Sequence, residues 1–169
     1  MLRPIVRFGA PVIHEPASDV KDVTPDLQQL IDDMIETMYA APGIGLAAPQ
    51  IGIPLRIFVA DVSSGRASRD LVAIINPTIE VREGTQSEQE GCLSIPGFNA
   101  TVERASRVVV SGLTREGDPQ TLEATGLQAR AFQHEIDHLN GLLFVDHLRG
   151  IKRELILRKI RKLQRTGKW

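Results

Sequence analysis

The residues His134, Glu135 and His138 form an H-E-x-x-H pattern, which restricts the structure of this 169-residue chain more than any other feature. On an α-helix, positions four apart lie on the same face, so both imidazoles point the same way. Glu135 then lies close enough to reach a water held by a metal. The pattern therefore predicts a helix with two metal ligands and a general base. The plain alternative is a helix with two surface histidines.

A catalytic metal needs a third protein ligand and an open position for water, and the residues after His138 offer no good candidate. Metzincin proteases extend the motif to H-E-x-x-H-x-x-G-x-x-H, and this chain follows them to Gly141 but has Phe144 at the last histidine. Glu154 is the only glutamate beyond His138, and it lies in a basic segment where we expect an exposed intrahelical ion pair.

Cys92 is the only cysteine, so it forms no disulfide within the chain. Its thiolate is a soft, anionic ligand that suits a first-row divalent metal beside two imidazoles. The alternative is a small buried apolar residue, the usual fate of a free cysteine. Beside the H-E-x-x-H pattern, the residue types favour a Cys/His/His site.

Three helices are predicted from apolar spacing and end signals. The first covers about 25–41, with Thr24 as its N-cap residue. The second covers 126–141, with Thr125 as N-cap and a final Asn-Gly pair as its stop. The third covers about 151–165 and carries one apolar stripe: Ile151, Leu155, Ile160 and Leu163.

Short β-rich runs separated by turn signals fill the middle of the chain, and we expect antiparallel sheet from 55 to 124. The runs are 56–62, 71–75, 78–83 and 106–113, with Asn76-Pro77 as one of the turns. Residues 42–54 are rich in glycine and proline and predict an ordered loop.

The expected fold is α+β, with antiparallel sheets packed around a central metal-binding helix, an N-terminal helix and a basic C-terminal helix. We expect a single domain, 1–169, in which 151–169 forms the basic helix and tail. The apolar runs are too short for a membrane span, and the N-terminus, interrupted by Pro4 and Pro11, lacks a secretory signal. These features predict a soluble cytoplasmic protein.

Three segments occur together in this order: GIGLAAPQ (43–50), EGCLSIPG (90–97) and QHEIDHLNG (133–141). Together they resemble the peptide deformylases, and the likeness extends over about 4–150. The resemblance implies that formyl is removed from the N-formylmethionine of nascent polypeptides, with release of formate. The GLQAR and PGF details look more like the organelle-type subgroup, which also has bacterial members, and we expect a bacterial cytoplasmic enzyme.

The resemblance also implies the ligands and the acid–base group. Cys92, His134 and His138 would hold ferrous iron, which nickel, cobalt or zinc can replace. A water bound to such a metal has a lowered pKa, near ~7. Glu135 would accept its proton as general base and return it to the leaving amine as general acid.

Further roles carried over by the resemblance concern the oxyanion, the peptide and the ligand surroundings. The Gln50 side-chain amide and the Leu93 backbone N–H would stabilise the oxyanion. The remaining implied residues are Ile44, Gly45 and Gly91 along the bound peptide, and the ion pair of Glu90 with Arg104. The plain alternatives are turn glycines, a surface amide and an ordinary surface ion pair.

Two residues depart from the family pattern, because Glu88 and Arg130 are polar where many bacterial members have aliphatic residues. We hypothesise that they form an ion pair at the pocket rim, so that the methionine side chain contacts Ile44, Leu127 and Ala131. His14 and His147 lie at no ligand spacing and are interpreted as structural or surface residues.

Residues 149–169 contain nine basic residues and one acid, a net charge of +8. The whole chain carries −1, so the remainder carries −9. Such a helix suits docking on ribosomal RNA, and no DNA or membrane partner is expected. The alternative is a solvated amphipathic helix that packs on the domain. Two rival functions remain: a zinc endopeptidase, and a ribosome-associated binding protein with an inert metal site.

Overall fold

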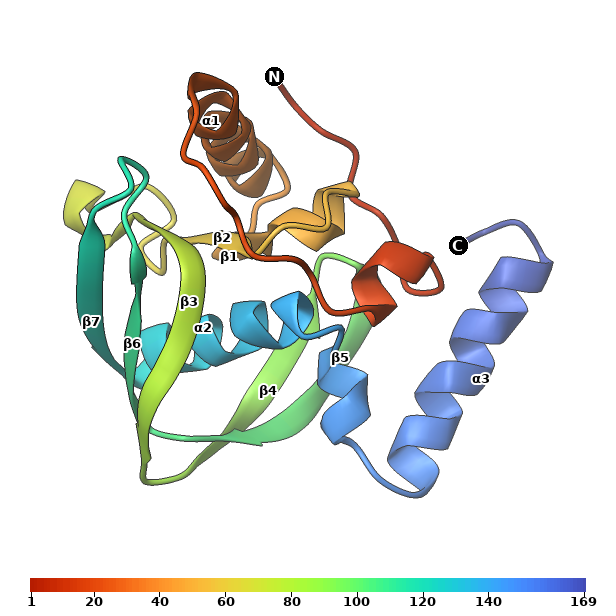
Figure 1. Cartoon of the computed structure of the whole chain (residues 1–169). Helices are drawn as coiled ribbons and strands as arrows, with labels where there is room; N and C mark the ends of the chain where they lie inside the picture. Colours follow the sequence, from red (N-terminus) through yellow and green to blue (C-terminus); the bar gives the residue numbers. More distant parts are fainter.

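Helix α2, Gly126–Leu139, lies between two sheets of different size (Figure 1). The computed structural model describes residues 1–169. One side of α2 packs on a five-stranded sheet, and the other side faces a separate two-stranded hairpin. The prediction of an α+β fold with antiparallel sheets around a central helix is confirmed.

The larger sheet has the strand order β1-β2-β3-β6-β7, and all neighbouring strands are antiparallel. The expected runs at 56–62 and 106–113 correspond to β2 and β6. The short β1 lies inside the predicted loop 42–54 and forms one edge of the sheet. The strands are β1 Gly45–Ala47, β2 Ile57–Ala60, β3 Val72–Glu83, β6 Arg107–Leu113 and β7 Pro119–Thr125.

The prediction of a turn at Asn76-Pro77 is wrong, because β3 continues through this pair with a shift in register. Proline lacks an N–H, and a bulge lets the ladder accommodate it. Asn76 has a φ of 52°, and its side chain accepts the Val20 N–H at 2.8 Å and donates to the Val20 carbonyl at 2.9 Å. The bulge therefore attaches the N-terminal segment to the sheet.

The hairpin consists of β4, Gln86–Cys92, and β5, Ile95–Arg104. The two strands form their own sheet and do not join the ladder of the larger one. Leu93 and Ser94 make the turn between them. Cys92 is consequently held at the tip of the hairpin.

The first two helices begin and end close to the predicted residues. Helix α1 is Pro25–Ala40, and the Thr24 hydroxyl accepts the Leu27 N–H at 3.2 Å, as expected of an N-cap. Thr125 is the N-cap residue of α2, but its side chain makes no capping hydrogen bond. Gly141 follows α2 with a φ of 79°, the left-handed conformation that ends many helices.

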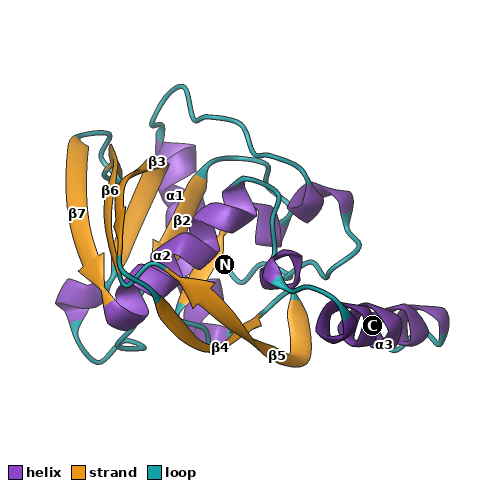
Figure 2. Cartoon of the chain, turned by 90° about the horizontal axis from the view of Figure 1, so that it is seen from below, coloured by secondary structure: helices purple, strands orange, loops and turns teal.

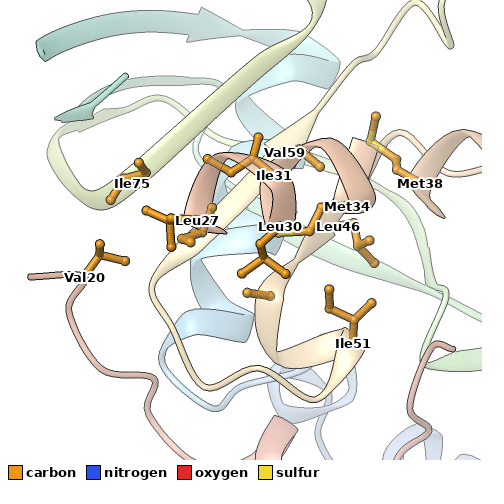
Figure 3. Packing of buried hydrophobic residues seen from close by; sticks show 12 residues of the cluster. Val20, Leu27, Leu30, Ile31, Met34, Met38, Leu46, Ile51, Val59 and Ile75 are labelled. Carbon is orange, nitrogen blue, oxygen red and sulfur yellow. The ribbon is translucent and has the colours of Figure 1, made fainter. Parts of the chain in front are cut away.

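Buried apolar side chains form three clusters. The first joins α1 to β1 and β2 and is shown in Figure 3. The second, the sheet–helix cluster, joins α2 to the larger sheet through Ala47, Phe58, Ala60, Ile74, Val108, Val110, Ala124, Ala129, Phe132, Ile136 and Leu139. The third, the hairpin cluster, consists of Ile13, Ile95, Val102, Leu143, Phe144, Val145, Leu148 and Ile160.

Helix α3, Ile151–Arg165, lies at one side of the molecule (Figure 2). Ile160 is buried, whereas Ile151 is 76% exposed and Leu155 47% exposed, so the predicted single apolar stripe is wrong. The reason is geometric: Ile160 follows Ile151 by about two and a half turns and lies on the opposite face. None of the helices combines the length and apolar character needed to span a membrane.

We predict that Ile31→Ala, in α1, lowers the free energy of unfolding by about 2–5 kcal/mol, because Ile31 is fully buried and its truncation leaves a cavity. The matched control Ile151→Ala removes the same atoms from an exposed helix position and should change stability by less than about 0.5 kcal/mol. Urea unfolding measures both values, and equal effects would contradict the described core.

Candidate metal centre

Three potential ligand atoms converge from two elements: the Cys92 sulfur from the tip of β4 and one ring nitrogen each of His134 and His138 from α2. The two Nε2 atoms are 3.2 Å apart, and the Cys92 Sγ is 3.3 Å from the His138 Nε2. Neighbouring ligands of a tetrahedral first-row cation lie roughly 3.3–3.6 Å apart. The donor set and its spacing therefore fit such a cation.

Glu90 fixes the orientation of one of these histidines. Its Oε1 lies 2.8 Å from the Nδ1 of His134, so this nitrogen donates its proton and the Nε2 lone pair faces Cys92 and His138. Arg104 donates from Nε to Oε2 at 2.9 Å and from Nη2 to Oε1 at 2.8 Å. Burial alone raises the pKa of Glu90, but the hydrogen bonds from Arg104 and His134 outweigh it and hold that pKa well below its usual range.

The hypothesis of a Glu88–Arg130 ion pair is contradicted. The Nη1 of Arg130 donates to the Oε2 of Glu90 at 2.5 Å, and Glu88 is exposed and makes no ion pair. Arg130 is only 4% exposed, so it points inward rather than along the pocket rim. A buried guanidinium needs a buried carboxylate, and a solvated Glu88 cannot serve it.

A second layer of charges lies behind Arg104. Its Nη1 also contacts the Asp137 carboxylate, whose Oδ2 is 2.7 Å from the Nε2 of His147. His147 was interpreted only as structural or surface, and its side chain is 36% exposed. Asp137 was missed, although it stands three residues after His134 and therefore on a neighbouring helix face.

Gln50 is buried beside the donor atoms and has a defined orientation. Its Oε1 accepts the Ala47 N–H at 3.0 Å, so the amide nitrogen points to the Ser94 hydroxyl at 3.2 Å and the Cys92 sulfur at 3.6 Å. Residues 5–8 brace this region, because the Val6 N–H donates to the Gln50 carbonyl at 2.8 Å. Ser94 was not predicted, since a serine in a turn has no distinctive signal.

Glu135 is 4% exposed, and its Oε1 is buried without a hydrogen-bond partner. Burial raises its pKa to about 7. Gly45 lies directly against this carboxylate, and a Cβ at position 45 would overlap it. The absence of a side chain at Gly45 is therefore required by the position of Glu135.

A cavity of about 370 Å³ opens beside these groups. Every residue predicted from the sequence to bind substrate lines it: Ile44, Gly45, Gly91, Leu127, Arg130 and Ala131. The other predicted site residues that line the cavity are Gln50, Glu90, Cys92, Leu93, His134 and Glu135. His138 and Arg104 are buried and do not line it. Phe98 and Asn99 of β5 also line the cavity and were missed, because they become neighbours of α2 only through the fold of the hairpin.

Comparisons with known proteins agree with this arrangement. A sequence profile of polypeptide deformylases matches residues 2–154. A peptide deformylase of Acidobacterium capsulatum is 48% identical over 100% of this chain and 99% of its own length, and one of Alkalilimnicola ehrlichii is 51% identical over 97% and 92%. The crystal structure of a peptide deformylase from Legionella pneumophila has a TM-score of 0.91 at 42% identity, covering 99% of this chain and 98% of that one.

A helix-borne H-E-x-x-H pattern that meets a cysteine from a neighbouring hairpin defines a class of metal-dependent hydrolases. The likeness extends along the whole chain and through the whole fold. The chain belongs to the peptide deformylase family. Enzymes of this family remove the N-formyl group from nascent peptides, and the chain is a hydrolase of this kind.

We predict that Glu90→Ala lowers the free energy of unfolding by about 3–5 kcal/mol, because it leaves the Arg104 and Arg130 guanidiniums buried without their shared partner. Glu88→Ala, two residues earlier on the same strand, should change stability by less than about 0.5 kcal/mol. Urea unfolding of the two variants measures the difference. A large loss of stability in Glu88→Ala would contradict this assignment and favour the Glu88–Arg130 ion pair.

Proposed function

We propose that Cys92, His134 and His138 hold one divalent cation per chain. The observation that carries the proposal is the convergence of a thiolate and two imidazoles at ligand spacing beside a buried carboxylate. We propose ferrous iron as the native cation, with nickel, cobalt or zinc as substitutes, because these borderline ions accept sulfur and nitrogen donors. When bound, the cation supplies a Lewis acid for the formyl oxygen and lowers the pKa of water.

Glu135 is proposed to move the proton. It follows His134 directly and faces the cavity, and its unpartnered Oε1 is free to accept a proton from a water in the site. A general base works best when its pKa lies near the working pH, and burial brings Glu135 there. The same carboxyl then returns the proton to the leaving amine nitrogen.

The oxyanion formed by attack on the formyl carbon is proposed to be stabilised by Gln50 and Leu93. The Gln50 amide nitrogen is aimed at the Cys92 side of the site because its oxygen is held by Ala47. Leu93 is the first residue of the turn that follows Cys92, so its backbone N–H lies at the same end of the cavity. Donors fixed before reaction avoid reorganisation when charge develops.

The peptide is proposed to lie along β1, in the manner of an added strand. The Ile44 carbonyl already accepts the Asp61 N–H at 2.8 Å. Bonded and non-bonded pairs alternate along an antiparallel ladder, so the peptide groups of Gly45 face away from β2 and toward the cavity. Across the cavity, Gly91 offers backbone groups of β4. The methionine side chain would contact Ile44, Leu127 and Ala131, all of which line the cavity.

The test is formate release from formyl-Met-Ala by iron-loaded protein prepared without oxygen. We expect turnover by the wild type, and a loss of about 10²–10⁴ in kcat for Glu135→Gln with unchanged iron content, because the proton acceptor is gone and the ligands remain. Glu88→Gln is the matched control and should keep its activity. Cleavage of internal peptide bonds, or full activity of Glu135→Gln, would contradict the proposal.

Helix α3 is proposed to contact the ribosome. It lies at the side of the molecule (Figure 2), and its arginines Arg158, Arg161 and Arg165 are exposed on one surface with Gln164. A cluster of cations beside an otherwise acidic body attracts the phosphates of RNA. The inner face of α3 packs on the domain through the buried Ile160, as the alternative of an amphipathic helix predicts. The arginines lie on other faces of the helix, so packing and RNA contact do not exclude each other.

We predict that the triple variant R158E/R161E/R165E loses salt-sensitive co-sedimentation with ribosomes, by about tenfold or more, because three phosphate contacts become repulsive. The variant R158K/R161K/R165K retains the charge and should still co-sediment. Formate release from formyl-Met-Ala should be unchanged in both. Equal ribosome binding by the two triple variants would contradict the proposed contact.

The last proposal concerns the cellular location of the enzyme and the chains on which it acts. We propose a bacterial cytoplasmic enzyme that acts on N-formylmethionyl chains as they emerge, with residues 1–169 as one catalytic domain. Its many bacterial relatives support this setting. The likeness to the organelle-type subgroup stays a prediction from the GLQAR and PGF segments.

A further inference from the structure

Arg130 occupies an unusual position for an arginine. It is 4% exposed, it lines the substrate cavity, and its Nε is buried without a partner. A buried donor without a partner costs free energy, and buried ion pairs contribute little net stability compared with apolar residues of the same volume. Stability alone therefore gives a weak reason for a guanidinium at this place.

The contacts of Arg130 all lead to the hairpin. Its Nη1 donates to the Oε2 of Glu90 at 2.5 Å and to the Val102 carbonyl at 3.0 Å, and its Nη2 lies 3.4 Å from the Gln86 carbonyl. Glu90 and Gln86 belong to β4, and Val102 belongs to β5. One side chain of α2 thus holds both strands of the hairpin.

Apolar packing does not make this connection. The apolar residues of α2 that pack in a core cluster belong to the sheet–helix cluster, whereas Ile95 and Val102 of the hairpin belong to the hairpin cluster. No backbone ladder joins the hairpin to the larger sheet. Polar contacts across this boundary, from His134 and Arg130 to Glu90, therefore link α2 directly to the hairpin.

Arg130 and His134 stand four residues apart on α2 and hold the two oxygens of one carboxylate. His134 binds Oε1 of Glu90 and Arg130 binds Oε2, while Arg104 spans both oxygens from β5. Each oxygen therefore has two donors, which is the full capacity of a carboxylate. The plane of the carboxylate, and with it the ring of His134, is fixed along the helix.

We propose that Arg130 is a positioning residue for the metal centre. Through Glu90 it sets the orientation of His134, and through Val102 and Gln86 it holds the hairpin so that Cys92 lies at ligand distance. The inference rests on the proposed Cys92/His134/His138 site. Partners of metal ligands contribute to affinity and geometry even without touching the metal.

Cobalt(II) is the probe, added to the full chain after removal of metal. We expect R130L to raise the cobalt dissociation constant about 10- to 100-fold, measured by chelator competition, and to shift the thiolate-to-cobalt absorption band. R130K keeps a charge for Glu90 but loses the two-pronged reach of the guanidinium, so its affinity should lie between those of R130L and wild type.

The matched control is R115L, because Arg115 also ties a hairpin turn to a helix, through Asp32 of α1, away from the donor atoms. It should lower thermal stability and leave the cobalt affinity within about twofold and the band unchanged. R130L with the affinity and spectrum of R115L would overturn the inference. If R130L does not fold, R130K is the deciding variant. A loss of cobalt affinity of about threefold or more, with an altered absorption band, supports the inference. Cobalt affinity and an absorption band equal to those of the wild type overturn it.

The two proposals fail in different ways. A wild-type chain that binds no cobalt would overturn the proposed metal site, and this inference with it. If the wild type, R130L and R130K all bind cobalt with the same affinity, the proposed metal site stands and only the role of Arg130 is overturned.

Discussion

The buried carboxylate of Glu90 is the contact on which the centre of this structure depends. It joins two parts of the molecule that share neither a backbone ladder nor an apolar cluster: the helix with both histidines and the hairpin with the cysteine. Four hydrogen bonds from three side chains use its full capacity. The low dielectric of the interior strengthens each bond and makes the removal of any partner costly.

Two buried carboxylates near the proposed metal site, those of Glu90 and Glu135, lie in different electrostatic environments. Glu90 is buried among cations that lower its pKa and keep it ionised, which suits the proposed role of orienting His134 rather than transferring a proton. Glu135 is buried without a partner for one oxygen, and its raised pKa suits a group that must gain and lose a proton. Carboxylates of similar burial thus acquire separate roles from their neighbours alone. Gly45 completes this division because any side chain there would displace Glu135.

Much of the site was predictable because several of its residues are close together in the sequence and form recognisable patterns. The H-E-x-x-H spacing indicates two ligands and a base on one helix face, since the helical repeat brings positions four apart together. The limits of α1 and α2 were predictable for the same reason: caps and stop signals act within one turn. Predictions failed where pairing with distant segments overrides the local preference of the chain. Asn76-Pro77 reads as a turn, but sheet pairing on both sides carries β3 through it as a bulge.

The sequence by itself determined the helices and the antiparallel strands, because helical and strand periodicity act over a few residues, and the chemistry of its residue types indicated the proposed donor set and acid–base group. Only the tertiary structure decided the partner of Arg130. Glu88 and Glu90 stand two apart on one strand and were equally available by sequence, but burial separates them and a desolvated guanidinium requires a desolvated carboxylate. The inner face of α3 was likewise decided by where the hairpin cluster lies. Contacts between distant segments depend on the packed shape of the chain, which no local pattern encodes.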